Sequence, residues 1–140
     1  MTRAEIERLL HQHHQDFLRR DSIALAANHL ADGTLESPES GLVQGRPAIE
    51  LFYRYWFTAF PDLELKWDEE LIDGDRASFF WTLTGTASGP FYGVVGRGTR
   101  VVANGAAGYR FADGGIQSAR HVFDFTGLLV ATGVLKAKPA

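Results

Sequence analysis

The sequence of 140 residues contains no cysteine. A chain without cysteine has no disulfide framework, no thiolate nucleophile and no cysteine zinc site. It also lacks an excess of basic residues, because 14 Lys and Arg are set against 17 Asp and Glu, for a formal net charge of −3. This balance argues against nucleic-acid binding, which usually requires a basic face.

Long apolar runs are missing as well. The N-terminal stretch "MTRAEIERLLHQHHQ" is charged and amphipathic and has no apolar signal core, and no later segment approaches the length that spans a membrane. We therefore expect a cytoplasmic protein that has no membrane partner. The length fits one domain over residues 1–140, which is large enough to bury a hydrophobic core without disulfide bonds or a structural metal.

Aromatic residues are abundant, with ten Phe, four Tyr and three Trp. In the first half of the chain the apolar spacing predicts three helices, over residues 3–20, 23–31 and 47–60. Thr2 and Glu5 have the spacing of a capping box for the first helix. The second helix is expected to end at the Asp-Gly pair that follows residue 31, and the segment after it to be a short extended piece and a loop.

The second half of the chain changes to a period of two residues. "LELKWDEELI" and "RASFFWTLTGTA" flank "DGD", and "TRVVANGAAGYRF" and "IQSARHVFDF" flank "ADGG", which predicts two hairpins. The last strand is expected to run out into a turn and a short apolar tail. Helices followed by an antiparallel meander predict an α+β domain, in which a curved sheet against helices leaves a conical, mostly apolar cavity open at one end.

Four segments carry a resemblance to a known family: "GRPAIELFYRYWFTAFPDL", "DGDRASFFWTLTGTASGPFYG", "YRFADGGI" and "DFTGLL". The chain resembles polyketide cyclases of the SnoaL type, in the superfamily that also holds ketosteroid isomerase and nuclear transport factor. The resemblance implies a cone-shaped, cystatin-like fold, with a curved antiparallel sheet wrapped around N-terminal helices, and a homodimer or homotetramer formed through the sheet. It also implies an Asp on the last strand that acts as acid and base in an intramolecular aldol condensation, without metal or cofactor; Asp124 matches that Asp.

Asp124 lies among apolar residues at the end of the last predicted strand. Because an ionised carboxylate is costly to bury, Asp124 either caps a turn or faces a cavity that needs an acid. We favour the cavity. There, desolvation would raise its pKa toward the working pH, where general acid–base transfer is most effective.

Two histidines are candidates for a second catalytic group. Strict alternation places His121 and Asp124 on opposite faces of the last strand, so His121 reaches the cavity only if a bulge lies between residues 120 and 124. His29, near the end of the second predicted helix, is the other candidate. Each could equally be a hydrogen-bonded structural histidine. The closely spaced His11, His13 and His14 are interpreted as surface and boundary residues.

Further residues are expected to bind the substrate. Glu36 lies where relatives carry pocket-facing polar residues, or it is a solvated loop carboxylate, and Asn104 could donate to a substrate oxygen or satisfy a bulge. Aromatic rings are expected at the cavity wall, where they would stack on a small hydrophobic ligand, polycyclic compounds included: Phe52, Trp56, Trp81 and Phe91.

These residues lead to one functional hypothesis and three alternatives. The leading hypothesis is a cofactor-free lyase or isomerase that closes a ring by aldol condensation, with Asp124 as acid and base. A non-catalytic small-molecule binding protein is the first alternative, and a ketosteroid-isomerase-like isomerase is the second. Epoxide hydrolysis is the third, and it would require a second carboxylate such as Glu36 facing Asp124.

Overall fold

The first helix begins at the capping box that the sequence predicts. In the computed structural model, which describes residues 1–136 and 138, the Thr2 hydroxyl accepts the Glu5 N–H at 3.2 Å and the Glu5 carboxylate accepts the Thr2 N–H at 2.6 Å. The helix that follows, α1 (Arg3–Leu18), turns one stripe of side chains inward, including Ile6, Leu10 and Phe17. The 3.6-residue period therefore fixes which face of α1 meets the sheet.

The second predicted helix is shorter than expected. Asp21 caps α2 (Ser22–Ala27), and the chain then enters strand β1 (His29–Ser37), which forms a hairpin with β2 (Gly41–Gln44). The expected helix end after residue 31 is wrong. Pairing of the start of β1 with β9, at His29 and Ile116, overrides the helical propensity of this alanine-rich segment. Helix α3 (Arg46–Ala59) follows, with Pro47 in its first turn.

The second half of the chain forms most of a curved sheet with strand order β2-β1-β9-β8-β5-β3. Its strands are β3 (Glu64–Trp67), β4 (Leu71–Asp73), β5 (Arg76–Ala87), β8 (Thr99–Ala112) and β9 (Gly115–Phe123). Both predicted turns are confirmed, since β4 pairs with β5 across "DGD" and β8 pairs with β9 across "ADGG". The single strand predicted for "LELKWDEELI" is wrong, because residues 68–70 divide it into β3 and β4. All pairs in this sheet are antiparallel except β1 with β9, which is parallel.

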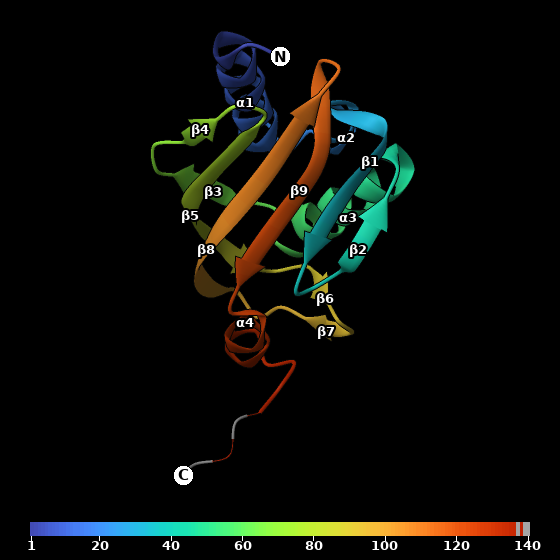
Figure 1. The fold of residues 1–140 in the computed structure, drawn as a ribbon. Helices are drawn as coiled ribbons and strands as arrows, with labels where there is room; N and C mark the ends of the chain where they lie inside the picture. The colour runs from blue at the N-terminus through green and yellow to red at the C-terminus, as the bar shows by residue number, and fades with distance from the viewer. Residues whose placement is uncertain (137, 139–140) are drawn as a thin grey trace.

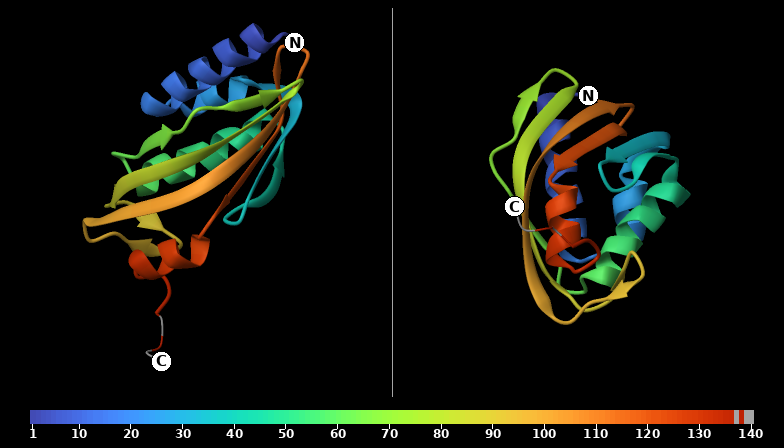
Figure 2. Two further views of the ribbon diagram at one scale, coloured as in Figure 1. Left: turned by 60° about the vertical axis from the view of Figure 1, so that its left-hand side comes forward. Right: turned by 90° about the horizontal axis from the view of Figure 1, so that it is seen from below.

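The sheet curves around the helices, and the predicted α+β fold is confirmed (Figure 1). Helices α1, α2 and α3 lie against its concave face. Seen from below, a short helix α4 (Phe125–Ala131) lies across the opening of the cone, beside a small hairpin of β6 (Pro90–Phe91) and β7 (Val94–Val95) (Figure 2). Sequence patterning predicts neither α4 nor this hairpin. Within the described residues, no helix is long and apolar enough to cross a membrane.

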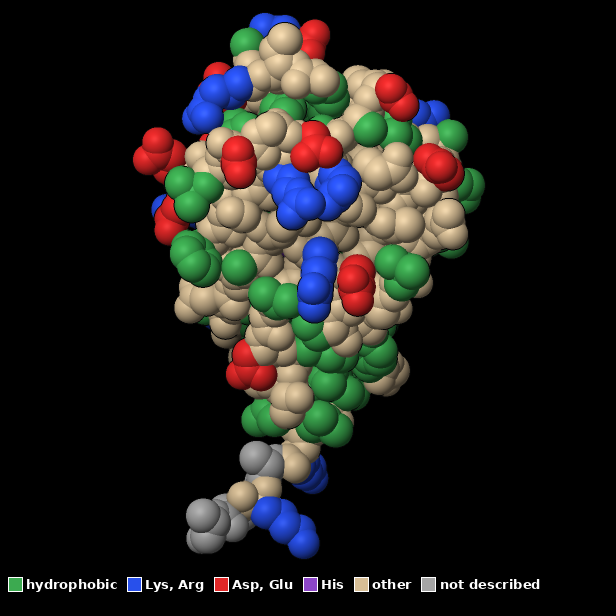
Figure 3. Space-filling model, viewed as in Figure 1, with side chains coloured by type: hydrophobic (Ala, Val, Ile, Leu, Met, Phe, Trp, Pro, Cys, Tyr) green, Lys and Arg blue, Asp and Glu red, His purple; other side chains and the backbone are tan. Residues whose placement is uncertain are grey.

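The outer face of the sheet carries both apolar and charged side chains. Figure 3 looks onto this face, where arginines gather near the centre among green apolar patches. Phe80 is 68% exposed there and Val102 is 63% exposed, which is unusual for large apolar side chains on one sheet face. Arg120 forms an ion pair with Glu36 on the same face. Charges of both signs beside exposed apolar groups suit contact with a second copy of the chain.

The expected homodimer or homotetramer stays a prediction, and Phe80 tests it. Phe80→Glu should shift the protein from an oligomer to a monomer in light scattering, because a charge would replace an apolar contact. Leu51→Glu is the matched control, since Leu51 is 59% exposed on α3 and away from the sheet. A wild-type mass equal to a single chain at every concentration would contradict the prediction.

Candidate functional site

A cavity of about 70 Å³ lies between the concave face of the sheet and helices α1 and α3. Its walls are mainly aromatic and come from helices and strands far apart in the sequence: Phe17, Phe52, Trp56, Trp67, Phe79, Trp81 and Phe123. Leu128 of α4 also lines it, so the short C-terminal helix contributes to the enclosure. The cavity is therefore assembled by the tertiary fold rather than by any one segment.

The aromatic residues predicted for the cavity wall divide into two groups. Phe52, Trp56 and Trp81 line the cavity. Phe91 is not among the lining residues; it is 2% exposed and packs against Trp56, with ring centroids 5.4 Å apart. The predicted position of Phe91 at the cavity wall is wrong, and Phe91 instead contacts Trp56 from strand β6. A role of the three lining rings in substrate binding stays a prediction.

Asp124 lies outside the cavity. It is exposed and is the N-cap of α4, where its carboxylate accepts the Gly127 N–H at 2.9 Å. The chain changes from strand to helix at this residue, and the first N–H groups of a helix need acceptors that a capping carboxylate supplies. The predicted cavity position of Asp124 is therefore wrong, and the capping alternative describes its contacts.

Glu36 and Asn104 also point away from the cavity. Glu36 is exposed on the outer face of the sheet, 3.8 Å from Arg120, and Asn104 accepts a hydrogen bond from the Thr82 hydroxyl at 2.9 Å on the same face. The prediction that Glu36 and Asn104 face the cavity is wrong, and in each case the adjacent residue faces it. Because side chains alternate along a strand, the neighbours Ser37 and Ala103 line the cavity instead.

His121 lines the cavity without a bulge. The β8–β9 ladder is regular from Arg110↔Ser118 to Gly105↔Phe123, so the prediction that His121 reaches the cavity only through a bulge is wrong. In β9 the side chains of His121 and Phe123 point into the cavity. The prediction assumed that Asp124 points inward, and alternation along the strand then placed His121 on the outer face.

His29 is buried but does not line the cavity. Its Nδ1 lies 3.0 Å from the carbonyl oxygen of Leu25, to which it donates, near the C-terminal end of α2. The imidazole thus satisfies a carbonyl that the helix leaves free, which is a structural role. His29 thus lies behind His13, with ring centroids 5.7 Å apart, and not in the cavity wall; a catalytic role for His29 stays a prediction.

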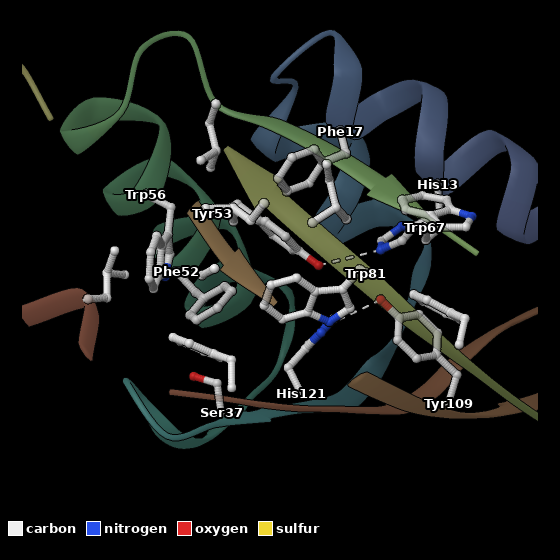
Figure 4. Close-up of a pocket in the computed structure, with 17 residues that line it drawn as sticks. His13, Phe17, Ser37, Phe52, Tyr53, Trp56, Trp67, Trp81, Tyr109 and His121 are labelled. Carbon is white, nitrogen blue, oxygen red and sulfur yellow. Dashed lines mark hydrogen bonds between the residues drawn. The ribbon is translucent and has the colours of Figure 1, made fainter. Parts of the chain in front are cut away.

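Three polar residues that sequence reasoning missed complete the site. His13, Tyr53 and Tyr109 line the cavity together with His121, and we call these four residues the polar cluster (Figure 4). The Tyr53 hydroxyl lies 3.4 Å from Nε2 of His13, and the Tyr109 hydroxyl lies 3.4 Å from Nε2 of His121. His13 is 5% exposed, so its interpretation as a surface or boundary residue is wrong.

The sequence does indicate that His13 is buried. His13 lies at helical spacing from Ile6, Leu10 and Phe17, on the face of α1 that points inward. Tyr109 likewise follows the inward alternation of β8, two residues after Ala107. Periodicity therefore locates both residues inside the fold, whereas their meeting with Tyr53 and His121 depends on tertiary packing.

Comparison with known proteins identifies the family. A model of the SnoaL-like polyketide cyclases matches residues 8–131. The chain belongs to the SnoaL-like polyketide cyclase family. A sequence search of curated proteins found no match.

Several solved structures share the SnoaL-like fold. AclR, a proposed hydroxylase from Streptomyces galilaeus, is 28% identical with a TM-score of 0.83, over 99% of this chain and 87% of that chain. A proposed SnoaL-like polyketide cyclase from Jannaschia sp. CCS1 is 21% identical with a TM-score of 0.83, over 97% and 94%. TsrD from Streptomyces laurentii is 22% identical with a TM-score of 0.81, over 96% and 99%. These likenesses support the fold and leave the reaction open.

Burial keeps the ionisable side chains around this SnoaL-like cavity neutral. Desolvation, with a smaller contribution from neighbouring His29, lowers the pKa of His121 to about 4 and that of His13 well below its usual value. Desolvation also lowers the pKa of His29 itself to about 4. It raises the pKa of Tyr53 and of Tyr109. At neutral pH the cluster therefore consists of uncharged imidazoles and phenols, which both donate and accept hydrogen bonds.

Two of the rings that line the cavity carry unpaired indole N–H groups. Nε1 of Trp56 and Nε1 of Trp81 are buried and have no hydrogen-bond partner within the protein. Buried donors of this kind are uncommon and each needs an explanation, such as a ligand atom that accepts from it. Gly105 leaves room for Trp81, because a methyl group at that position would collide with the indole. Among the described residues, no group of three ligating side chains is placed to hold a metal ion.

The neutral histidines predict a pH dependence of stability. Because the pKa values of His29 and His121 in the folded state lie near 4, the unfolded chain, with His pKa values of about 6.5, binds more protons between these limits. The free energy of unfolding should therefore be highest above pH 6.5. Below pH 6.5 it should decrease by up to about 1.4 kcal/mol per pH unit for each buried histidine.

Urea unfolding between pH 7.5 and 5 measures this slope above the range where most carboxylates titrate. His121→Gln should make the slope shallower, whereas His11→Gln should leave it unchanged, because His11 is exposed on α1. A free energy of unfolding that stays flat down to pH 5 would show that these histidines are not buried in neutral form.

Proposed function

We propose that the chain is a cyclase that closes a ring in a small apolar carbonyl compound by intramolecular aldol condensation, with His121 as acid and base. The observation that carries the proposal is the pairing of the Tyr109 hydroxyl with Nε2 of His121 inside an apolar cavity. A neutral imidazole beside a phenol provides a proton acceptor and a hydrogen-bond donor in one place. Membership of the polyketide cyclase family supports the choice of reaction class.

The Tyr109 hydroxyl and the His121 imidazole act together in the first step. The Tyr109 hydroxyl donates to the carbonyl oxygen of the substrate, where negative charge develops, and Nε2 of His121 takes a proton from the neighbouring carbon. The 3.4 Å between the two groups is longer than an ordinary hydrogen bond. A substrate oxygen therefore displaces this weak contact at little cost.

Ring closure then follows without a redox partner. The enolate carbon attacks a second carbonyl of the same molecule, one carbon–carbon bond forms, and the new alkoxide takes back the proton that the His121 imidazolium holds. An imidazole with a pKa of about 4 is a weak base. Bases of similar strength act next to a carbonyl when donors stabilise the enolate in a low-dielectric site.

The cavity favours a modest substrate. Its volume of about 70 Å³ is well below the roughly 300–1,000 Å³ of sites for drug-sized ligands. We propose a planar compound with one or two rings that stacks on the aromatic walls and whose oxygens accept from the Trp56 and Trp81 N–H groups. Because a cavity of about 150 Å³ is what holds a single benzene ring, the walls, or α4 at the opening, must move to admit this compound. A polycyclic ligand would need a larger movement.

The alternatives differ in their requirements. An isomerase of the ketosteroid type uses the same proton abstraction and returns the proton to another carbon of the substrate. A binding protein uses the same cavity without turnover. Epoxide hydrolysis has less support, because none of the described residues lining the cavity is a carboxylate.

Proton exchange tests the proposal without knowledge of the natural substrate. With 2-tetralone, a ketone with two fused rings, wild-type protein in D2O should accelerate exchange of the protons next to the carbonyl, followed by NMR. His121→Gln and Tyr109→Phe should each slow the catalysed exchange by about 10²–10⁴-fold, the usual contribution of a positioned proton-transfer group. Affinity for the ketone should change little, because shape and apolar contacts remain.

Asp124→Asn is the control for this experiment. Asn caps a helix about as well as Asp, so stability should hold, and exchange should match the wild type because Asp124 lies outside the cavity. Loss of exchange in Asp124→Asn alone would return the catalytic role to Asp124. Binding of the ketone without any accelerated exchange would instead support the binding protein.

A further inference from the structure

The Tyr53 hydroxyl is a polar group of the cavity that the proposed reaction does not use. Tyr53 comes from α3 and is 5% exposed, and its hydroxyl points toward the middle of the cavity, as does that of Tyr109 from β8 (Figure 4). Within the described residues, its single hydrogen-bond partner is Nε2 of His13, at 3.4 Å. Which of these two side chains donates decides whether Tyr53 has a hydrogen left for a ligand.

The contacts on the other side of His13 determine the position of its proton. Nδ2 of Asn28 lies 3.0 Å from Nδ1 of His13 and 2.9 Å from Oδ2 of Asp16. The Asp16 carboxylate pairs with Arg19 through its other oxygen. An ionised carboxylate only accepts hydrogen bonds, so the Asn28 atom that faces Asp16 must be the NH2 group. Its two hydrogens serve Asp16 and His13, and Nδ1 of His13 is therefore an acceptor.

The direction of the bond between His13 and Tyr53 follows. Burial lowers the pKa of His13 well below its usual value, so the imidazole is neutral at pH 7 and carries one proton. Because Nδ1 is an acceptor, this proton lies on Nε2, and His13 donates to the Tyr53 oxygen. The Tyr53 hydrogen then has no acceptor among the described residues. A buried hydrogen-bond donor without a partner costs free energy, which a ligand oxygen in the cavity would recover.

We propose that Tyr53 is a second catalytic residue, which donates to the carbonyl oxygen that the enolate attacks, and that Asn28 and Asp16 are positioning residues that keep its hydrogen free. The catalytic role rests on the proposed function, in which Tyr109 and His121 form the enolate at the first carbonyl. When the carbon–carbon bond forms, the electron pair of the second carbonyl moves to its oxygen. Tyr53 stabilises that charge until the oxygen takes the proton that His121 holds.

This arrangement narrows the class of substrate to compounds with two carbonyl groups. One phenol donor is then available for each carbonyl oxygen, at Tyr109 and at Tyr53. The probe 2,6-heptanedione belongs to this class, because aldol addition within the molecule and loss of water convert it to 3-methylcyclohex-2-enone. The matched monoketone is 2-heptanone, which has the same chain length and cannot close a ring.

Histidine tautomers measured by ¹⁵N NMR test the positioning. In full-length protein labelled at histidine, at pH 7.5, His13 should carry its proton on Nε2. Asn28→Asp replaces the NH2 group by an oxygen that only accepts, so His13 should then carry a proton on Nδ1. Gln12→Ala is the control, because it removes a different hydrogen bond from Asp16 and should leave the tautomer unchanged. A proton on Nδ1 in the wild type, or no change in Asn28→Asp, would overturn the positioning.

Ring closure separates the role of Tyr53 from that of Tyr109. Tyr53→Phe should slow ring closure of 2,6-heptanedione by about 10²–10³-fold in the maximal rate, the usual contribution of one donor to a developing oxyanion. It should slow proton exchange in 2-tetralone, which has one carbonyl, much less. Tyr109→Phe should slow both reactions, because it acts at enolate formation. Equal slowing of both reactions by Tyr53→Phe would overturn the assignment of Tyr53 to the second carbonyl.

Ligand binding distinguishes this proposal from the proposed function, because it needs no turnover. Dissociation constants for 2,6-heptanedione and 2-heptanone can be measured from tryptophan fluorescence, since Trp56 and Trp81 line the cavity. Tyr53→Phe should shift the ratio of the two constants by about 2–10-fold against the diketone, the contribution of one hydrogen bond. An unchanged ratio would overturn the proposal even if the wild type closes the ring. A shifted ratio without ring closure by the wild type would support the donor and refute the proposed function.

Discussion

Desolvation of four polar side chains inside an aromatic cavity is the constraint on which the site depends. His13, Tyr53, Tyr109 and His121 are surrounded by rings, and each buried polar group must find a hydrogen-bond partner or lose free energy. They find one another, and burial keeps all four uncharged at neutral pH. None of the described residues that line the cavity is a carboxylate, a lysine or an arginine. The cavity wall therefore carries hydrogen-bonding groups that are uncharged at neutral pH.

The fold meets this constraint through two periodicities. The helical period of α1 turns His13 inward, and the two-residue alternation of β8 and β9 turns Tyr109 and His121 onto the same concave face. Their register, in which Ala107 pairs with His121 and Tyr109 pairs with Ala119, makes these two side chains diagonal neighbours on adjacent strands. A slip of one residue between β8 and β9 would turn one of these two side chains to the outer face and separate them. The contact between Tyr109 and His121 therefore depends on the register set by the "ADGG" hairpin.

Much of the architecture could be predicted from sequence because its signals are local. The capping box at Thr2, both aspartate–glycine turns and the inward period of α3 all specify neighbouring backbone. The first residues of strand β1 were missed because they pair with the distant strand β9, whereas only the later part of β1 forms a local hairpin with β2. Asp124 was misplaced because the sequence looks the same whether a carboxylate at the end of a strand caps a helix or points into a cavity. The link from Asn28 to His13 joins two helices, and no spacing along the chain announces it.

The central claim is that His121 is a neutral imidazole inside the cavity, and its titration tests that claim most directly. The imidazole resonances of His121, assigned with His121→Gln, can be followed by NMR as the pH is lowered. The account predicts that His121 stays neutral until the pH approaches about 4, because burial opposes its charged form. Titration near the unperturbed value of about 6.5 would contradict the account, because it would place the imidazole in water rather than among the aromatic walls.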